Sequence, residues 1–212
     1  KRLGDISGIE ALTSLQRLSL YRCESLTDLR PLQGLTNLID LDLSYCRAIS
    51  DLSGLEGLVN LIELDLYECV ALQNLQALRP LEGLSMRFGH PGMKDLSPLK
   101  DLTLLTVLHL NHGMSWSYRF ANVGLTDLSP LKGLSGLTLL TLGYCKNLSD
   151  AEVDALCQAL PDCEIMRRKK PLIFAEYTDA QLLALGVSRQ QLGRVRQVST
   201  DRQMAALQDV IS

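Results

Sequence analysis

Five carboxylate side chains lie in the first third of the chain at positions that repeat every 23 residues. Two tyrosines flank them, and the group consists of Asp40, Asp42, Glu63, Asp65 and Glu68 with Tyr45 and Tyr67. Like charges at this spacing repel one another unless a cation or a basic partner neutralises them. These residues therefore predict a surface that binds a basic protein segment. The alternative interpretation is a solvated acidic face that Arg17 and Arg22 partly neutralise.

The same residues do not indicate a metal centre or a catalytic site. Ca²⁺ takes about six to eight oxygen ligands, and carboxylates on strands rarely enclose an ion so completely. His109 and His112 are neighbours in the sequence, but two ligands do not make a zinc site. The sequence also lacks a triad motif, a glycine-rich phosphate loop and an HExxH motif. We therefore expect no metal, no cofactor and no enzymatic activity.

A second candidate contact element is the segment 114–123, which interrupts the regular spacing of the chain. It holds three aromatic side chains, Trp116, Tyr118 and Phe120, with polar residues between them. Exposed aromatic side chains on a loop are typical of protein contacts. The alternative is that the rings fold back and pack locally over a sheet edge. Arg87 and His109 complete the predicted partner-binding set, because both fall at outward positions of predicted strands.

These residues are positioned by a repeated unit, of which Leu35–Gly57 is the clearest copy. Leu38, Leu41 and Leu43 give it the pattern LxxLxL, and both neighbouring segments repeat the same spacing. A coil this small cannot bury its own apolar edge, so each coil must stack on the next. The period predicts a leucine-rich repeat solenoid of the α/β class, with a curved parallel sheet whose concave face carries the residues between the leucines.

The second half of each unit predicts the convex side of the solenoid. It has the pattern DLxPL or DLxGL, in which aspartate accepts backbone N–H groups and proline presets φ at the start of a helical turn. Short 3₁₀ turns are therefore expected there instead of full helices. The fourth coil restarts after only 20 residues, and this early restart aligns Ser85 with Asp65 and Arg87 with Tyr67.

Four of the six cysteines occupy one repeat position, namely Cys23, Cys46, Cys69 and Cys145. A small, easily buried side chain at this place is typical of a core position. Neighbouring coils would bring the thiols to about 5 Å, so a bridge is conceivable. The sequence has no CxxC pair, and we interpret the cysteines as reduced core residues in a reducing, cytoplasmic compartment.

The chain divides into three predicted parts. Residues 1–165 form the solenoid of about six coils, and they begin with a half repeat, because Asp5–Ala11 matches Asp51–Gly57. A helix beginning at Ser149 and a last strand near 162–165 should close the array. Residues 166–177 are a predicted linker and 178–212 a small all-α module. The solenoid carries a net charge of −7 and residues 166–212 a net charge of +4. The missing half of the first repeat predicts a longer protein.

The motif LxxLxLxxCxxLxDLxPLxG resembles those of bacterial leucine-rich repeat proteins. It shares the short convex turns of internalin-type repeats and the cysteine position of the cysteine-containing type, over about residues 3–165. The resemblance implies protein binding through the concave face. Residues 185–207 also look like a small helical element found beside bacterial helicase-type and other multidomain proteins.

Two functions follow from these patterns. The first is a protein-interaction module, a monomer or part of a larger chain, that acts through the concave face and segment 114–123. The second is an accessory module of a nucleic-acid-associated protein, in which the basic tail after residue 166 contacts phosphates. The first is favoured because a basic run of this kind is usually a solvated linker. No apolar run approaches the length of about 20 residues that a membrane-spanning helix needs.

Overall fold

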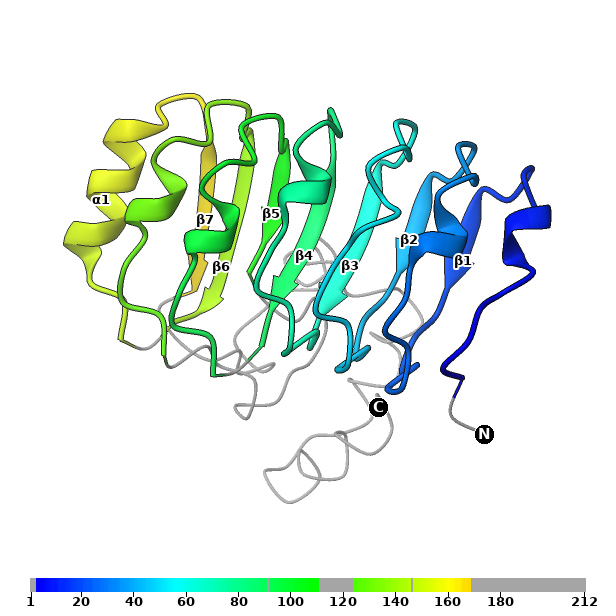
Figure 1. Ribbon diagram of the computed structural model, residues 1–212. Coiled ribbons are helices and arrows are strands. Elements are labelled where there is room, and N and C mark those ends of the chain that lie inside the picture. The colour runs from blue at the N-terminus through cyan, green and yellow to red at the C-terminus, as the bar shows by residue number, and fades with distance from the viewer. Residues whose placement is uncertain (1–2, 91, 111–123, 146, 169–212) are drawn as a thin grey trace, which may run out of the picture.

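A computed structural model describes residues 3–90, 92–110, 124–145 and 147–168 of the chain. In these residues, seven parallel strands form one open sheet in the order of the chain, with the turns between them on the opposite side (Figure 1). This arrangement confirms the predicted solenoid. The strands are β1 (Arg17–Ser19), β2 (Asp40–Asp42), β3 (Glu63–Tyr67), β4 (Ser85–Gly89), β5 (Val107–His109), β6 (Leu139–Tyr144) and β7 (Glu164–Arg168).

Five of the described coils have a single 3₁₀ turn on their convex side, as predicted, whereas residues 51–57 form a turn without one. Before the three turns that contain proline, an aspartate accepts a backbone N–H two residues on: Asp28 Oδ1 accepts that of Arg30 at 2.9 Å, and Asp95 and Asp127 accept the same bond at 2.8 Å. Hydrogen bonds from the Arg30 side chain and backbone lower the pKa of Asp28 to about 2. The turns are η1 (Ile9–Ala11), η2 (Arg30–Leu32), η3 (Gln76–Leu78), η4 (Ser97–Leu99) and η6 (Ser129–Leu131).

Coils with glycine in place of proline bend differently from the others. Gly54 has φ 107° and Gly8 has φ 92°, a region that side chains with a Cβ rarely adopt. In both coils a glutamate two residues on accepts the glycine N–H at 2.7 Å, through Glu56 Oε2 and Glu10 Oε2. The shared geometry shows that the first segment of the chain has the local structure of the repeat it matches.

The core is a continuous stack of leucines between the sheet and the turns. Leu38, Leu41 and Leu43 have no exposed surface, and the leucines at the same positions of the next coils are buried as well. Full burial of one such side chain is worth about 1.5–3 kcal/mol. The solenoid is therefore stabilised by each coil covering its neighbour.

The fourth coil corrects the predicted register. Ser85 pairs with Glu63 and Arg87 with Asp65, so the sequence alignment of this coil was wrong by two residues. The cause is Phe88, which is buried opposite Leu66 and takes the place of the third inward leucine. The inward pattern of the coil therefore ends at Phe88 and not at Met86, which moves Arg87 from the row of Tyr67 to the row of Asp65.

The cysteines of the repeat tie neighbouring coils together. Cys46 Sγ donates to the carbonyl of Leu20 at 3.1 Å, and Cys69 Sγ donates to that of Leu43 at 3.2 Å. All six cysteines of the chain are free thiols, and Cys23 and Cys145 are also buried. Burial raises the pKa of Cys46 and of Cys145 to about 11, which disfavours the reactive thiolate.

Thiol accessibility tests this arrangement directly. In the folded protein Cys157, which is exposed on the last helix, should react with an aromatic disulfide reagent, whereas the four repeat thiols should not. The repeat thiols should react once denaturant unfolds the chain. Mass spectrometry of the modified peptides checks this, with Cys157→Ser as the control. Rapid labelling of Cys46 or Cys69 under native conditions would contradict the buried ladder.

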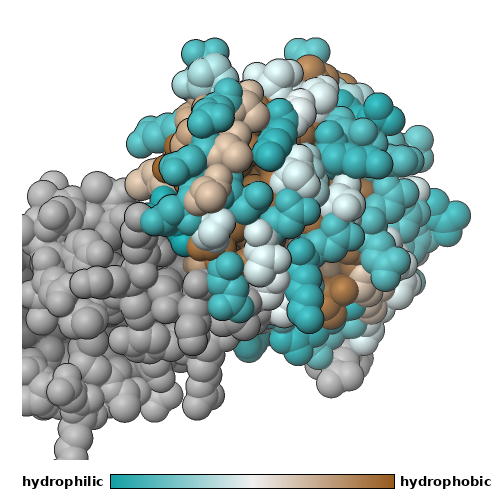
Figure 2. Space-filling model, turned by 90° about the vertical axis from the view of Figure 1, so that its left-hand side faces the viewer, coloured by the Kyte–Doolittle hydropathy of each residue, from teal (hydrophilic) through white to brown (hydrophobic). Residues whose placement is uncertain are grey.

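Helix α1 (Asp150–Ala159) and β7 close the C-terminal end of the described solenoid. Ser149 Oγ accepts the N–H of Glu152 at 3.1 Å, as the predicted helix start requires. Leu156 is fully buried, and the end face outside it shows mainly hydrophilic side chains (Figure 2). Residues 166–168 belong to β7 and not to a linker, which corrects that boundary.

Several predicted parts lie outside the described residues. They are the whole insertion 114–123, with Trp116, Tyr118 and Phe120, the predicted linker after residue 168 and the predicted helical module 178–212. The division of the chain into three parts stays a prediction.

Candidate functional site

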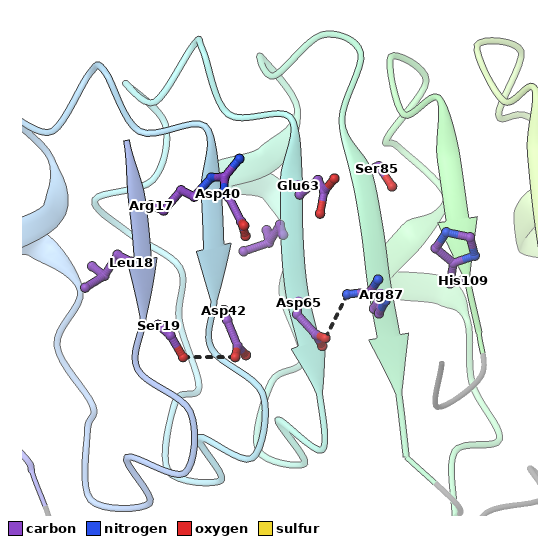
Figure 3. A pocket seen from close by; sticks show the side chains of 11 residues that line it. Arg17, Leu18, Ser19, Asp40, Asp42, Glu63, Asp65, Ser85, Arg87 and His109 are labelled. Carbon is purple, nitrogen blue, oxygen red and sulfur yellow. Dashed lines mark hydrogen bonds and ion pairs between the residues drawn. The ribbon is translucent and has the colours of Figure 1, made fainter. Parts of the chain in front are cut away.

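The concave face of the sheet carries two rows of side chains, because each strand turns its alternate residues to this side. The rows run across the strands in register, and both enter Figure 3. The first row is Arg17, Asp40, Glu63, Ser85, Val107, Leu139 and Glu164. The second row is Ser19, Asp42, Asp65, Arg87, His109, Thr141 and Met166.

The two carboxylates of the second row accept hydrogen bonds from the protein backbone. Asp42 Oδ1 accepts the backbone N–H of Ser44, and Asp65 Oδ1 accepts that of Tyr67, both at 2.9 Å. The other oxygen of Asp42 accepts a hydrogen bond from Ser19 Oγ at 3.0 Å (Figure 3). These bonds hold the turn after each strand. Asp42 and Asp65 therefore have a structural role that sequence reasoning missed.

Arg87 neutralises part of the negative charge of the second row. Its guanidinium lies 3.3 Å from Asp65 Oδ2 and forms an ion pair that Figure 3 shows between β3 and β4. Burial raises the pKa of Asp65, and the hydrogen bond from the Tyr67 backbone and the charge of Arg87 act against this shift. The charge of Asp65, one of the carboxylates of the predicted patch, is therefore balanced within the protein by Arg87.

Asp40 and Glu63 form the part of the acidic surface that is open to a partner. They pair directly across β2 and β3, where neighbouring strands lie about 4.8 Å apart. Asp40 is half-buried and Glu63 is exposed, and within the described residues neither carboxylate has a hydrogen bond or an ion pair. Arg17 on β1 is in register with Asp40, but among the described residues it forms no ion pair with it. The two adjacent carboxylates therefore still favour a positively charged group on a binding partner.

The rows surround a shallow hollow of about 470 Å³ between β1 and β5. Asp40, Glu63 and Ser85 line one side, and the second-row residues from Ser19 to His109 line the other (Figure 3). His109 closes the hollow at β5, where its Nδ1 lies 2.9 Å from Thr141 Oγ1. Burial and then the charge of Arg87 lower the pKa of His109, which favours its neutral form.

A rim of tyrosines and arginines follows the strands of the first three coils. The residue that turns each strand end, Arg22, Tyr45 or Glu68, has φ near 60°, a conformation uncommon outside glycine. The turn places the Tyr45 ring edge-to-face between the rings of Tyr21 and Tyr67, at centroid distances of 5.5 and 5.7 Å. Aromatic pairs of this geometry stabilise a surface beyond simple burial.

The same rim changes the interpretation of two predicted contact residues. Tyr67 is only 5% exposed and Glu68 only 7%. Glu68 forms an ion pair with Arg47 at 2.9 Å, and the Arg47 guanidinium also lies over the Tyr45 ring at 5.8 Å from its centroid. Tyr67 and Glu68 therefore support the rim, whereas the half-buried Tyr45 and the exposed Tyr21 present its surface.

Two solved structures from Listeria monocytogenes are similar to this chain. One is an internalin (inlF), at 29% identity over 78% of this chain and 44% of that chain, with a TM-score of 0.55. The other is internalin C2 (inlC2), at 27% identity over 81% of this chain and 72% of that chain, also with a TM-score of 0.55. The family model described as leucine rich repeats (2 copies) matches residues 13–57.

The chain has the leucine-rich repeat fold. Its repeats are internalin-like, which confirms the resemblance drawn from the motif. This chain spans less than half of the length of the inlF structure. None of the curated proteins matches it.

Sequence reasoning missed the second half of the leucine-rich repeat sheet. Val107 and Leu139 continue the first row, and Met166 continues the second with 39% of its surface exposed. The repeat spacing could have placed these residues on the concave face, but only polar and aromatic residues were considered as candidates. The first row therefore changes from charged residues at β1 to β3 to aliphatic residues at β5 and β6, before Glu164 at β7.

The structure gives no support to the alternative nucleic-acid contact in the residues it describes. Arg167, the first arginine of the basic run, pairs with Asp150 at 2.5 Å and donates to the carbonyl of Leu148. It therefore fastens β7 to the start of α1. The described residues also contain no group of three or more side chains arranged to hold a metal ion. No helix within them is long and apolar enough to cross a membrane.

Proposed function

We propose that this leucine-rich repeat chain is a protein-binding module that captures a protein partner on the concave face of its sheet. Proteins with such repeats generally act as protein-binding scaffolds, and the internalin-like repeats support the same role here. In this proposal the chain carries no catalytic activity of its own and serves to hold its partner.

The observation that supports this function best is the pair Asp40 and Glu63 beside the 470 Å³ hollow. The other carboxylates of the predicted patch stabilise the fold: Asp42 and Asp65 accept hydrogen bonds from backbone N–H groups, and Glu68 is buried. Asp40 and Glu63 serve no such purpose among the described residues, although two adjacent like charges repel one another. A partner that brings a positive group to this place removes the repulsion.

Site-specific photo-crosslinking tests the proposal. Ser85, in the middle of the concave face, is replaced by p-benzoylphenylalanine, and the full chain is irradiated in an extract of its source organism. We expect a discrete protein adduct. The matched control carries the same group at Lys132, an exposed residue that follows η6 on the convex side. An adduct from position 132 without one from position 85 would show that the concave face is not the binding surface.

A further inference from the structure

The concave face has two chemically different halves, and the boundary between them lies at β4. From β1 to β3 its first row carries Arg17, Asp40 and Glu63, and at β5 and β6 it carries Val107 and Leu139. Val107 and Leu139 are half-buried and lie in direct register on neighbouring strands. Two adjacent aliphatic side chains on an open sheet face form a small apolar contact area.

The second row shares only part of this division, because His109 and Thr141 at β5 and β6 are polar and only Met166 is apolar. Asp42 and Asp65 lie on the acidic half, and Met166 at β7 lies on the other half with 39% of its surface exposed. Between them, Arg87 takes up the charge of Asp65 through their ion pair. The negative charge that is left on the face is therefore concentrated at β2 and β3, away from the aliphatic residues. Only Glu164, at the far edge strand, returns a carboxylate to the first row.

We propose that the chain recognises a partner segment that presents a lysine or arginine to Asp40 and Glu63 and an apolar side chain to Val107 and Leu139. This inference rests on the proposed function and names the chemistry of the partner. The two contacts are three strands apart, a separation of about 14 Å. An extended chain spans this distance in about four residues, so the segment crosses the strands with its basic and apolar residues about four positions apart.

The two contacts have different roles in the recognition. The carboxylates sit in a half-open hollow and attract the basic group over several ångströms, which sets the orientation of the segment and speeds its approach. The aliphatic pair removes apolar surface from water once the segment lies flat, at about 25 cal/mol for each Å² buried. A segment with only one of the two features therefore binds less tightly than one with both.

Selection of a random peptide library displayed on phage tests the inference with the full chain as target. We expect enrichment of lysine or arginine about four residues from leucine, isoleucine, valine, phenylalanine or methionine. The variant Asp40→Lys with Glu63→Lys should select aspartate or glutamate at the basic position and keep the apolar preference. The variant Val107→Ser with Leu139→Ser should keep the basic preference and lose the apolar one.

A charge-reversed control, Glu82→Lys with Asp154→Lys, changes two exposed carboxylates outside both rows and should leave the selected peptides unchanged. Circular dichroism establishes that each variant is folded. Unchanged charge preference in the Asp40 and Glu63 variant, or peptides without paired basic and apolar residues, would overturn the inference. The crosslink at position 85 is a separate result, so the proposed function can stand when the inference fails.

Discussion

Replacing Leu35 by alanine should lower the free energy of unfolding by about 2–5 kcal/mol. Leu35 has no exposed surface and belongs to the leucine stack between two coils. Truncation leaves a cavity, because the coils on either side are held in register by the sheet and cannot close over it. Chemical denaturation followed by circular dichroism measures the loss.

Leu12 provides a control of the same chemistry. It occupies the repeat position of Leu35 in the first coil, but 52% of its surface is exposed. The change Leu12→Ala should therefore cost well under about 1 kcal/mol, because little buried surface is removed. Equal losses for the two variants would contradict the continuous core.

Replacing Gly54 by alanine should destabilise the protein by at least about 2 kcal/mol. Gly54 has φ 107°, and an added Cβ would lie 2.6 Å from the carbonyl oxygen of Leu29 and 2.8 Å from the Cα of Arg30. Both obstacles are backbone atoms of the preceding coil, so relief requires two coils to separate. The thermal unfolding midpoint should fall accordingly.

Gly34 is the matched control for this variant. It also lies in a convex turn, but an added Cβ would meet no atom within 4 Å and its φ is not positive in the strained range. Gly34→Ala should therefore leave stability unchanged or raise it by about 0.4–1 kcal/mol. A similar loss in both variants would show that the tight packing at Gly54 is not what limits the substitution.

Most of the fold could be predicted because the period of the leucines states it directly. The burial of Leu38, Leu41 and Leu43 follows from their spacing. The hydrogen bond that Asp28 accepts from the backbone N–H of Arg30 follows from its position before a proline. The fourth coil could not be aligned correctly in this way. Phe88 occupies a position that is leucine in the other coils. An alignment based on leucines alone therefore cannot find the register of this coil.

The candidate site was harder to predict than the fold. Asp40 and Glu63 were placed correctly beside each other, because register follows from the repeat. The roles of Asp42 and Asp65 in the turns after their strands depend on which backbone N–H groups their oxygens contact. Residue types alone do not predict these contacts. Burial likewise separates Tyr67 from Tyr45, although both occur near the same repeat position.

The sequence-based interpretation described an acidic patch in the first third of the chain and left out the apolar residues of the concave face. Arg87 came to lie beside Asp65 through the register of the fourth coil, and the aliphatic residues Val107 and Leu139 were not considered. The proposals for a partner on the Trp116 segment, a cytoplasmic location and a larger parent chain stay predictions.

The thiol ladder gives the described solenoid a direction. Cys69 and Cys46 each donate a hydrogen bond to the preceding coil, at Leu43 and Leu20. Helix α1 covers the C-terminal end of the described solenoid. At the other end Leu3 and Leu12 are nearly half exposed or more. When residues 1–212 are heated as an isolated chain, the exposure of Leu3 and Leu12 should let the coils separate in order from β1, and those beside α1 should melt last.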